Sequence, residues 1–206
     1  MQKLPERILC FVTPSITKFN SNSFFEFIKY AIDGGVNMIQ IRDKKAKSHE
    51  LKQFSTKLYK IAGNEIIVMI NSEFIPNYSN ISGIHFPEKI NVSKFSPLPK
   101  NKIFGQSTHS LRSAKISEEN GINYLIVGSI FKSNSHPNGN VSGTSIIKEI
   151  VKSTSLPVIG IGGITLENAE SVIKSGANGI AVISEISRFK NPYKISKSLS
   201  EIINTN

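Results

Sequence analysis

A repeated order of helix, glycine and apolar strand constrains the fold of this chain more than any other feature. In each repeat a helix-like segment ends at glycine, and a short aliphatic run follows it. Glycine suits the end of a helix because it adopts a left-handed backbone at little cost. An aliphatic run between polar turns is typical of a parallel strand that is buried on both faces. The clearest repeats are residues 31–42, 116–129 and 172–184.

Eight such strands alternate with helical patterns along the chain. We predict strands at residues 8–13, 38–42, 66–71, 83–86, 102–107, 124–129, 157–162 and 179–184. We predict helices at residues 22–33, 48–63, 110–120, 143–154, 165–176 and 191–204. The segments after the third and fourth strands are short or irregular, so we expect degenerate helices there. This order predicts an α/β fold, a small (β/α)8 TIM barrel with few insertions that forms one domain over residues 1–206. An open doubly wound sheet is the alternative.

The chain is basic, which limits the ligands that it attracts. It has 25 lysine and arginine residues against 15 acidic residues, for a net charge of +10. The basic residues are scattered, and no segment interleaves them with aromatic residues, so we do not expect a nucleic-acid partner. Small anionic ligands explain the same bias.

Cysteine content and hydropathy give expectations about the compartment. Cys10 is the single cysteine and lies in an apolar run, so we expect a buried core residue without a disulfide. No apolar run approaches the roughly 20 residues of a membrane span, and the N-terminus lacks a signal-peptide layout. We therefore expect a cytoplasmic protein with no membrane partner. A homo-oligomer is left open.

The second strand carries polar residues toward the rim where active sites of such barrels lie. Gln40 and Arg42 alternate with aliphatic residues, so they share one face, and Lys44 follows. An arginine inside a barrel requires an anionic partner. We therefore assign these three residues to binding of a diphosphate or carboxylate. The alternative is an internal salt bridge of Arg42 with Asp43 or Glu88.

Neutral and titratable side chains follow the next strands. Asn71 ends the third strand and Ser107 ends the fifth, and we expect both to bind the ligand. His85 either points into the site or only packs inside the barrel. Glu88 and His109 follow at the rim.

The last three strand ends complete the predicted site. The irregular segment 128–143 is long enough for a lid and supplies Ser133, Ser135 and His136 as polar contacts; a surface loop without a role is the alternative. Backbone amides at the ends of the seventh and eighth strands, with a serine hydroxyl, can surround a phosphate. The residues at these two ends are Gly162, Gly163, Ile183 and Ser184. Plain tight turns are the alternative.

Seven rim segments occur in a specific order through nearly the whole chain: QIRDK, INSE, GIHF, GQSTHS, GSIFKSNSH, PVIGIGGIT and GANGIAVIS. The set resembles the thiamine phosphate synthase and TenI family. The resemblance implies a phosphorylated thiazole ligand, with its phosphate at Gly163, Ile183 and Ser184. In the synthase branch, a hydroxymethylpyrimidine diphosphate ionises and the thiazole nitrogen captures the pyrimidine carbocation. There, cationic residues and Mg²⁺ carry the diphosphate.

Two departures weaken the metal half of that site. The resemblance implies metal-binding aspartates at positions that are Ser72 and Ile90 here, whereas Mg²⁺ prefers charged oxygen ligands. We therefore assign no metal-binding residue, and we expect Mg²⁺ only if the chain acts as a synthase. The family's strand-six lysine is also replaced, by His136.

These departures favour the TenI branch, whose members isomerise a thiazole carboxylate phosphate by moving a proton. The acid/base histidine of that branch falls on Ser129 here. We therefore assign proton transfer to His136, with Ser107 and Lys44 as further catalytic residues. The alternative proton carrier is His109 or His85.

The main hypothesis is thus a TenI-type protein of thiamine biosynthesis that binds and isomerises a phosphorylated thiazole. The first alternative is a divergent thiamine phosphate synthase. The second is a non-catalytic phosphate-ligand-binding or regulatory protein. The first two of these three make the chain an enzyme.

Overall fold

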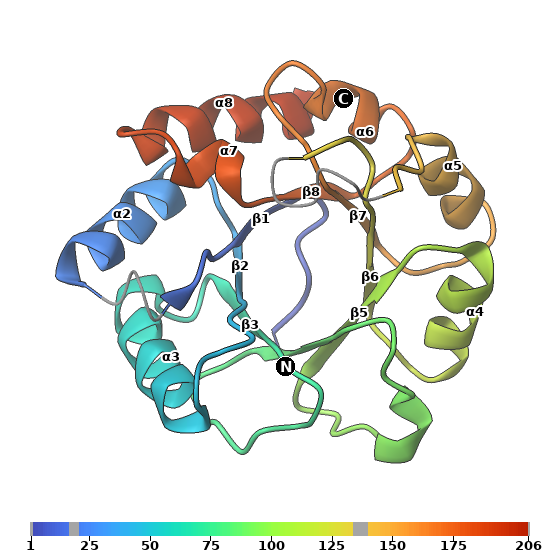
Figure 1. Cartoon of the computed structure of the whole chain (residues 1–206), viewed down its shortest axis with the longest axis horizontal. Coiled ribbons are helices and arrows are strands. Elements are labelled where there is room, and N and C mark those ends of the chain that lie inside the picture. Colours follow the sequence, from blue (N-terminus) through green and yellow to red (C-terminus); the bar gives the residue numbers. More distant parts are fainter. Residues whose placement is uncertain (1, 17–20, 134–139, 206) are drawn as a thin grey trace.

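The computed structural model describes residues 2–16, 21–133 and 140–205 and forms a closed barrel of eight parallel strands (Figure 1). The strands pair in chain order, and the last pairs with the first. This confirms the predicted TIM barrel and excludes an open sheet, which would leave two edge strands unpaired. The strands are β1 (Ile8–Val12), β2 (Met38–Ile41), β3 (Ile67–Asn71), β4 (Gly83–Phe86), β5 (Ile103–Thr108), β6 (Tyr124–Val127), β7 (Val158–Ile161) and β8 (Gly179–Val182).

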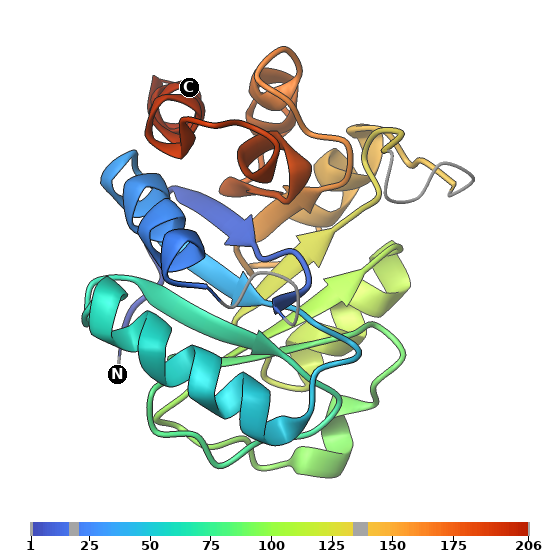
Figure 2. The ribbon, with the colours of Figure 1, turned by 60° about the vertical axis from the view of Figure 1, so that its left-hand side comes forward.

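Helices surround the barrel on its outside (Figures 1 and 2). They are α2 (Asn22–Asp33), α3 (Ser48–Ala62), α4 (Leu111–Glu119), α5 (Ser145–Val151), α6 (Ala169–Ile173), α7 (Ser184–Ser187) and α8 (Pro192–Thr205). All six predicted helices are present, and the short α7 is an addition. The α6 helix begins later than predicted because the Asn168 side chain accepts the Thr165 amide in a preceding turn. As predicted, residues 72–82 form no helix, and only the 3₁₀ turn η1 (Val92–Phe95) follows β4.

The glycine and asparagine of the three clearest repeats share one structural role. The glycines Gly35, Gly121 and Gly176 adopt positive φ, at 109°, 77° and 98°. Two residues later, an asparagine side chain accepts a backbone N–H near the start of the preceding strand. The pairs are Asn37 with Leu9, Asn123 with Phe104, and Asn178 with Val158. The repeat therefore turns helix into strand and ties each new strand to its neighbour.

Alternate residues of the strands face two separate apolar cores. Inward-pointing residues fill the barrel, among them Ile8, Cys10, Met38, Met69, Tyr124 and Ile159. Outward-pointing residues pack beneath the helices, among them Leu9, Phe11, Ile39, Ile84, Leu125 and Ile180. Cys10 is fully buried, as predicted, and burial raises the pKa of its thiol to about 12.

Because the strands are parallel, their carboxyl ends form a single rim (Figure 2). The inward set changes from aliphatic to polar toward this rim: in β2, Met38 is followed two residues later by Gln40. Of the helices in the described ranges, none combines the length and the apolar character needed to cross a membrane.

Candidate active site

A cavity of about 320 Å³ lies at the carboxyl rim of the barrel. Every described residue that the sequence assigned to the site lines this cavity: Gln40, Arg42, Lys44, Asn71, Ser107, Ser133, Gly162, Gly163, Ile183 and Ser184. The two remaining assignments, Ser135 and His136, lie outside the described residues. The fold thus brings residues from six strand ends into one cavity, and their binding roles stay predictions.

Gln40 lines the cavity and holds a buried hydrogen-bond donor that is unpaired among the described residues. Its side chain is buried, and Oε1 accepts a hydrogen bond from Asn71 Nδ2 at 3.3 Å. Within the described chain, Nε2 has no hydrogen-bond partner. An unpaired buried donor costs about 1–3 kcal/mol, and pairing it with a ligand atom would require the Gln40 amide to turn toward the cavity.

Arg42 and Lys44 bring positive charge to the same wall of the cavity. Neither forms an ion pair with any residue in the described ranges. The acids suggested as internal partners of Arg42 are engaged elsewhere: Asp43 accepts a serine hydroxyl at 2.7 Å, and Glu88 binds a histidine. The internal salt bridge is therefore wrong, and both cations are available to an anionic ligand.

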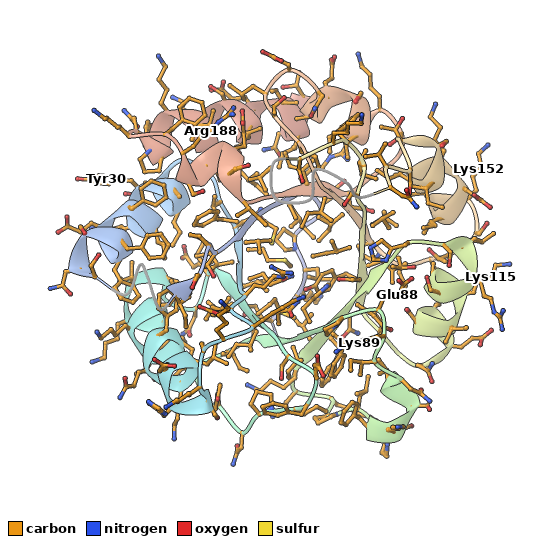
Figure 3. The ribbon with its side chains drawn as sticks, viewed as in Figure 1. Tyr30, Glu88, Lys89, Lys115, Lys152 and Arg188 are labelled. Carbon is orange, nitrogen blue, oxygen red and sulfur yellow. The ribbon has the colours of Figure 1, made fainter. Side chains whose placement is uncertain are left out.

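Glu88 and His109 form a pair beside the cavity. Oε2 of Glu88 lies 2.6 Å from Nδ1 of His109, and Oε1 accepts the His109 amide at 3.0 Å. Burial works to raise the pKa of the Glu88 carboxyl, but hydrogen bonds from Ser113 and His109 together lower it below its ordinary value. Figure 3 shows Glu88 near the mouth of the barrel, whereas Lys115 and Lys152 extend outward from the ring of helices. The lowered pKa favours the ionised carboxylate, and both of its oxygens are engaged by His109.

The His85 side chain is buried inside the barrel. Its Nε2 lies 2.9 Å from Ser107 Oγ, and its Nδ1 lies 3.1 Å from the hydroxyl of Tyr124. Burial, and secondarily the charge of Arg42, lower the pKa of His85 to about 3. The ring is therefore neutral at ordinary pH, which makes His85 unsuitable as the alternative proton carrier.

Tyr124 is the one partner in this group that the sequence analysis did not identify. It lies below the cavity, in a strand that reads as uniformly apolar. A tyrosine hydroxyl at an inward-pointing position is the signal that was available, because a buried hydroxyl needs a partner.

The backbone conformation after β7 requires glycine at positions 162 and 163. Gly162 and Gly163 adopt φ of 105° and 62°, and a Cβ on Gly163 would lie 2.2 Å from the Lys132 carbonyl oxygen. The Gly162 carbonyl accepts the Phe131 amide at 2.9 Å. The Gly163 N–H, which points the opposite way across the same peptide, has no partner among the described residues. Gly163 and Ser184, the first residue of α7, both line the cavity, and N–H groups in a first helical turn have no partner within the helix. We call this part of the cavity the amide-rich end.

The family model described as "Thiamine monophosphate synthase" matches residues 9–186. The chain belongs to this family. Two similar relatives are named thiamine-phosphate synthase. That of Coprothermobacter proteolyticus is 30% identical over 98% of both chains, and that of Clostridium acetobutylicum is 36% identical over 79% of both chains. The solved thiamine phosphate pyrophosphorylase from Pyrococcus furiosus superposes with a TM-score of 0.84 at 26% identity, covering 97% of this chain and 96% of that one.

These names correct the order of the functional hypotheses. They agree with the expectation of an enzyme, and they favour the synthase alternative over the TenI-type isomerase. The family resemblance inferred from the rim segments is confirmed.

The donor atoms near the cavity do not fit a protein-built Mg²⁺ site of the kind that the family implies. Among the described residues, no three His, Cys, Asp or Glu side chains are grouped to hold a metal ion. Glu88 lines the cavity but binds His109, the Ser72 hydroxyl accepts the Phe74 amide, and Ile90 packs on the core. A single engaged carboxylate falls short of the charged oxygens that fix Mg²⁺ on a protein.

Proposed function

We propose that this chain is a thiamine phosphate synthase, which joins hydroxymethylpyrimidine diphosphate to thiazole phosphate and releases diphosphate. The observation that carries the proposal is the presence of two groups suited to anions in one cavity. One is the cationic wall of Arg42 and Lys44, and the other is the amide-rich end at Gly163 and Ser184. A reaction between two phosphorylated substrates needs both groups at once. The names of relatives that align over most of the chain support the same choice.

The cationic wall serves the bond that breaks. The bond between the pyrimidine methylene carbon and the diphosphate oxygen ionises, and its electron pair leaves with the diphosphate. Arg42 and Lys44 neutralise the charge that grows on the leaving oxygens, and this lowers the barrier because the charges are fixed before reaction. Gln40 lines the cavity beside them, and its Nε2 would become a further donor if the side-chain amide turned toward the ligand.

The amide-rich end serves the bond that forms. The Gly163 N–H and the Ser184 hydroxyl hold the thiazole phosphate and so fix the ring relative to the carbocation. The thiazole nitrogen donates its lone pair to the methylene carbon, and a thiazolium forms. No proton moves in either step, so the reaction needs no general base. This suits a site in which His85 stays neutral and hydrogen-bonded.

A second candidate, the TenI-type isomerase, is favoured by one specific observation. Ser72 and Ile90 occupy the positions of the family's metal-binding aspartates, and a proton transfer has no use for that metal. A thiazole carboxylate can use Arg42 and Lys44 in place of a diphosphate.

The deciding experiment supplies purified protein with each substrate set separately. Pyrimidine diphosphate and thiazole phosphate are incubated with and without Mg²⁺, and thiamine phosphate and diphosphate are quantified. We expect both products in equal amounts at an enzymatic rate. Thiazole carboxylate phosphate is followed in parallel by NMR for proton migration.

The outcomes separate the three functions. Isomerisation without thiamine phosphate would replace the synthase by the TenI-type enzyme. Binding of thiazole phosphate with no turnover in either assay would indicate a binding or regulatory protein. Lys44→Gln should slow the synthase reaction, whereas Lys45→Gln is a matched control, because Lys45 is exposed and does not line the cavity.

A further inference from the structure

A chain of three hydrogen-bonded side chains connects the cavity with the interior of the barrel. It runs from Ser107, which lines the cavity, through His85 to Tyr124. Tyr124 is fully buried, and its ring centroid lies 5.5 Å from that of His85. A polar chain inside an apolar barrel is costly unless every donor in it is paired.

The strand register makes this chain possible. His85 in β4 pairs with Gly105 in β5, and Gly105 pairs with Tyr124 in β6, so all three residues lie at one level of the barrel. A Cβ on Gly105 would lie 2.1 Å from Cζ of the Tyr124 ring. The missing side chain at Gly105 therefore leaves the space through which Tyr124 reaches across one strand to His85.

His85 carries a single ring proton in this environment. Its pKa is lowered to about 3, first by burial and then by Arg42. Burial, with the nearby Cys10, raises the pKa of Tyr124 well above its ordinary value, so the phenol also keeps its proton. Two neutral arrangements are then possible, which differ in the ring nitrogen that carries the proton.

The hydroxyl of Tyr124 decides between these arrangements. If Nδ1 carried the proton, it would donate to the Tyr124 oxygen, and the phenolic O–H would need another acceptor. The described residues offer it none. If Nε2 carries the proton, Tyr124 donates to Nδ1, Nε2–H donates to Ser107, and each buried donor is paired.

We propose that Tyr124 is a positioning residue that holds His85 in its Nε2–H form and thereby directs the Ser107 hydroxyl proton into the cavity. Because Ser107 Oγ accepts from His85, its own O–H is left to donate to a ligand. Ser107 is then a hydrogen-bond donor to an anion and is not a nucleophile activated by histidine.

The ligand of this donor is a diphosphate oxygen, an assignment that rests on the proposed synthase function. Ser107 and Arg42 both line the cavity, and β2, which leads to Arg42, and β5, which carries Ser107, lie on the same side of the barrel from β7 and β8. A donor held in place before the substrate arrives stabilises the leaving group without reorganisation.

The first test observes the tautomer itself. Protein labelled with ¹⁵N-histidine is examined by long-range ¹H–¹⁵N correlation NMR, and His85 is assigned with a His85→Gln variant. We expect a protonated Nε2 and an unprotonated Nδ1 in the unmodified protein, and loss of this single form in Tyr124→Phe. A protonated Nδ1 in the unmodified protein would overturn the proposal.

The second test is a double-mutant cycle with inorganic pyrophosphate as the probe, measured by calorimetry. Tyr124→Phe should weaken binding about three- to tenfold, and it should have no further effect once Ser107→Ala is present. An equal loss in both backgrounds would show that Tyr124 only supports packing and would refute the positioning role. If pyrophosphate does not bind even to the unmodified protein, the proposed function loses support, while the NMR result still decides the role of Tyr124.

Tyr78→Phe is the matched control. Tyr78 is also buried and hydrogen-bonded, to Ser48, but it does not line the cavity. The Tyr78→Phe variant should lose about as much thermal stability as Tyr124→Phe, without a change in pyrophosphate affinity or in the His85 tautomer.

Discussion

The two ends of the cavity offer different kinds of group to an anionic ligand. At the end formed by β7 and β8, the groups offered to a ligand are backbone amides, and glycine conformation holds them in place. At the end formed by β2 to β5, the groups are the side chains of Arg42, Lys44, Gln40 and Ser107.

This difference predicts which end of the cavity tolerates substitution. The amide-rich end depends on φ angles and close backbone packing, so few residues fit at Gly162 and Gly163. The side-chain end tolerates substitution, since each group is set on its own strand. We expect the two ends to be separable by mutation.

The largest effect should come from the cationic wall. Arg42→Gln should lower kcat/KM for the pyrimidine diphosphate about 100-fold, because a charged hydrogen-bonding partner of the leaving group is lost. The affinity for thiazole phosphate should change less than about twofold, since we propose that this ligand binds at the other end. Arg112→Gln is the control, as Arg112 is exposed and away from the cavity. Parallel losses for both substrates would contradict two separable ends.

Lowering the pH should destabilise the protein through His85, which lies at the side-chain end of the cavity. Its folded pKa of about 3 lies below the unfolded value of 6.5, so the unfolded chain binds the proton first as the pH falls. Stability is therefore complete above the unfolded value, and the free energy of unfolding should fall by about 2 kcal/mol between pH 7 and pH 5. Urea unfolding of the unmodified protein and of His85→Gln measures this. Equal slopes for the two proteins would remove His85 as the cause.

The amide-rich end should be broken by a side chain at Gly163. Gly163→Val should weaken thiazole phosphate binding by about tenfold or more, because φ of 62° and the nearby Lys132 carbonyl both oppose a Cβ. Calorimetry with thiazole phosphate gives the affinity, and circular dichroism checks the fold.

Gly63→Val separates the two causes in that experiment. Gly63 has nearly the same φ, 64°, but a Cβ there meets nothing within 4 Å. The Gly63→Val variant should be less stable through backbone strain alone and should keep its affinity for thiazole phosphate. Unchanged affinity in Gly163→Val would exclude the amide-rich end as a phosphate site.

The smallest effect should come from Ser133, which lines the cavity in the segment after β6. A neutral hydroxyl contributes one ordinary hydrogen bond, so Ser133→Ala should weaken its ligand about threefold. Titrating the variant with pyrophosphate and with thiazole phosphate shows which end the segment after β6 serves. Ser142→Ala is the control, because Ser142 is exposed and does not line the cavity. No loss for either ligand would remove Ser133 from the site.

The fold could be predicted from local sequence because each repeat contains the residues that form its own turn. The glycines at 35, 121 and 176 and the asparagines two residues later fix both the helix end and the pairing of the next strand. Buried parallel strands also read clearly as aliphatic runs. The α6 start was misplaced because Thr165 favours a helix cap locally, whereas Asn168 forms the turn in the folded chain.

Site residues at strand ends were predictable for a related reason. In a barrel, every carboxyl end reaches the same rim, so position along the chain translates into position in space. This placed residues as distant as Gln40 and Ser184 in one cavity.

The sequence by itself determined the barrel, its rim and the cations and glycines that stand there, because these depend on local conformation and on strand alternation. Only the tertiary structure decided which groups meet. It paired Glu88 with His109, gave Arg42 no ion pair among the described residues and connected Ser107 to Tyr124 through His85. These contacts depend on the register between neighbouring strands and on the space at Gly105, which no single segment specifies.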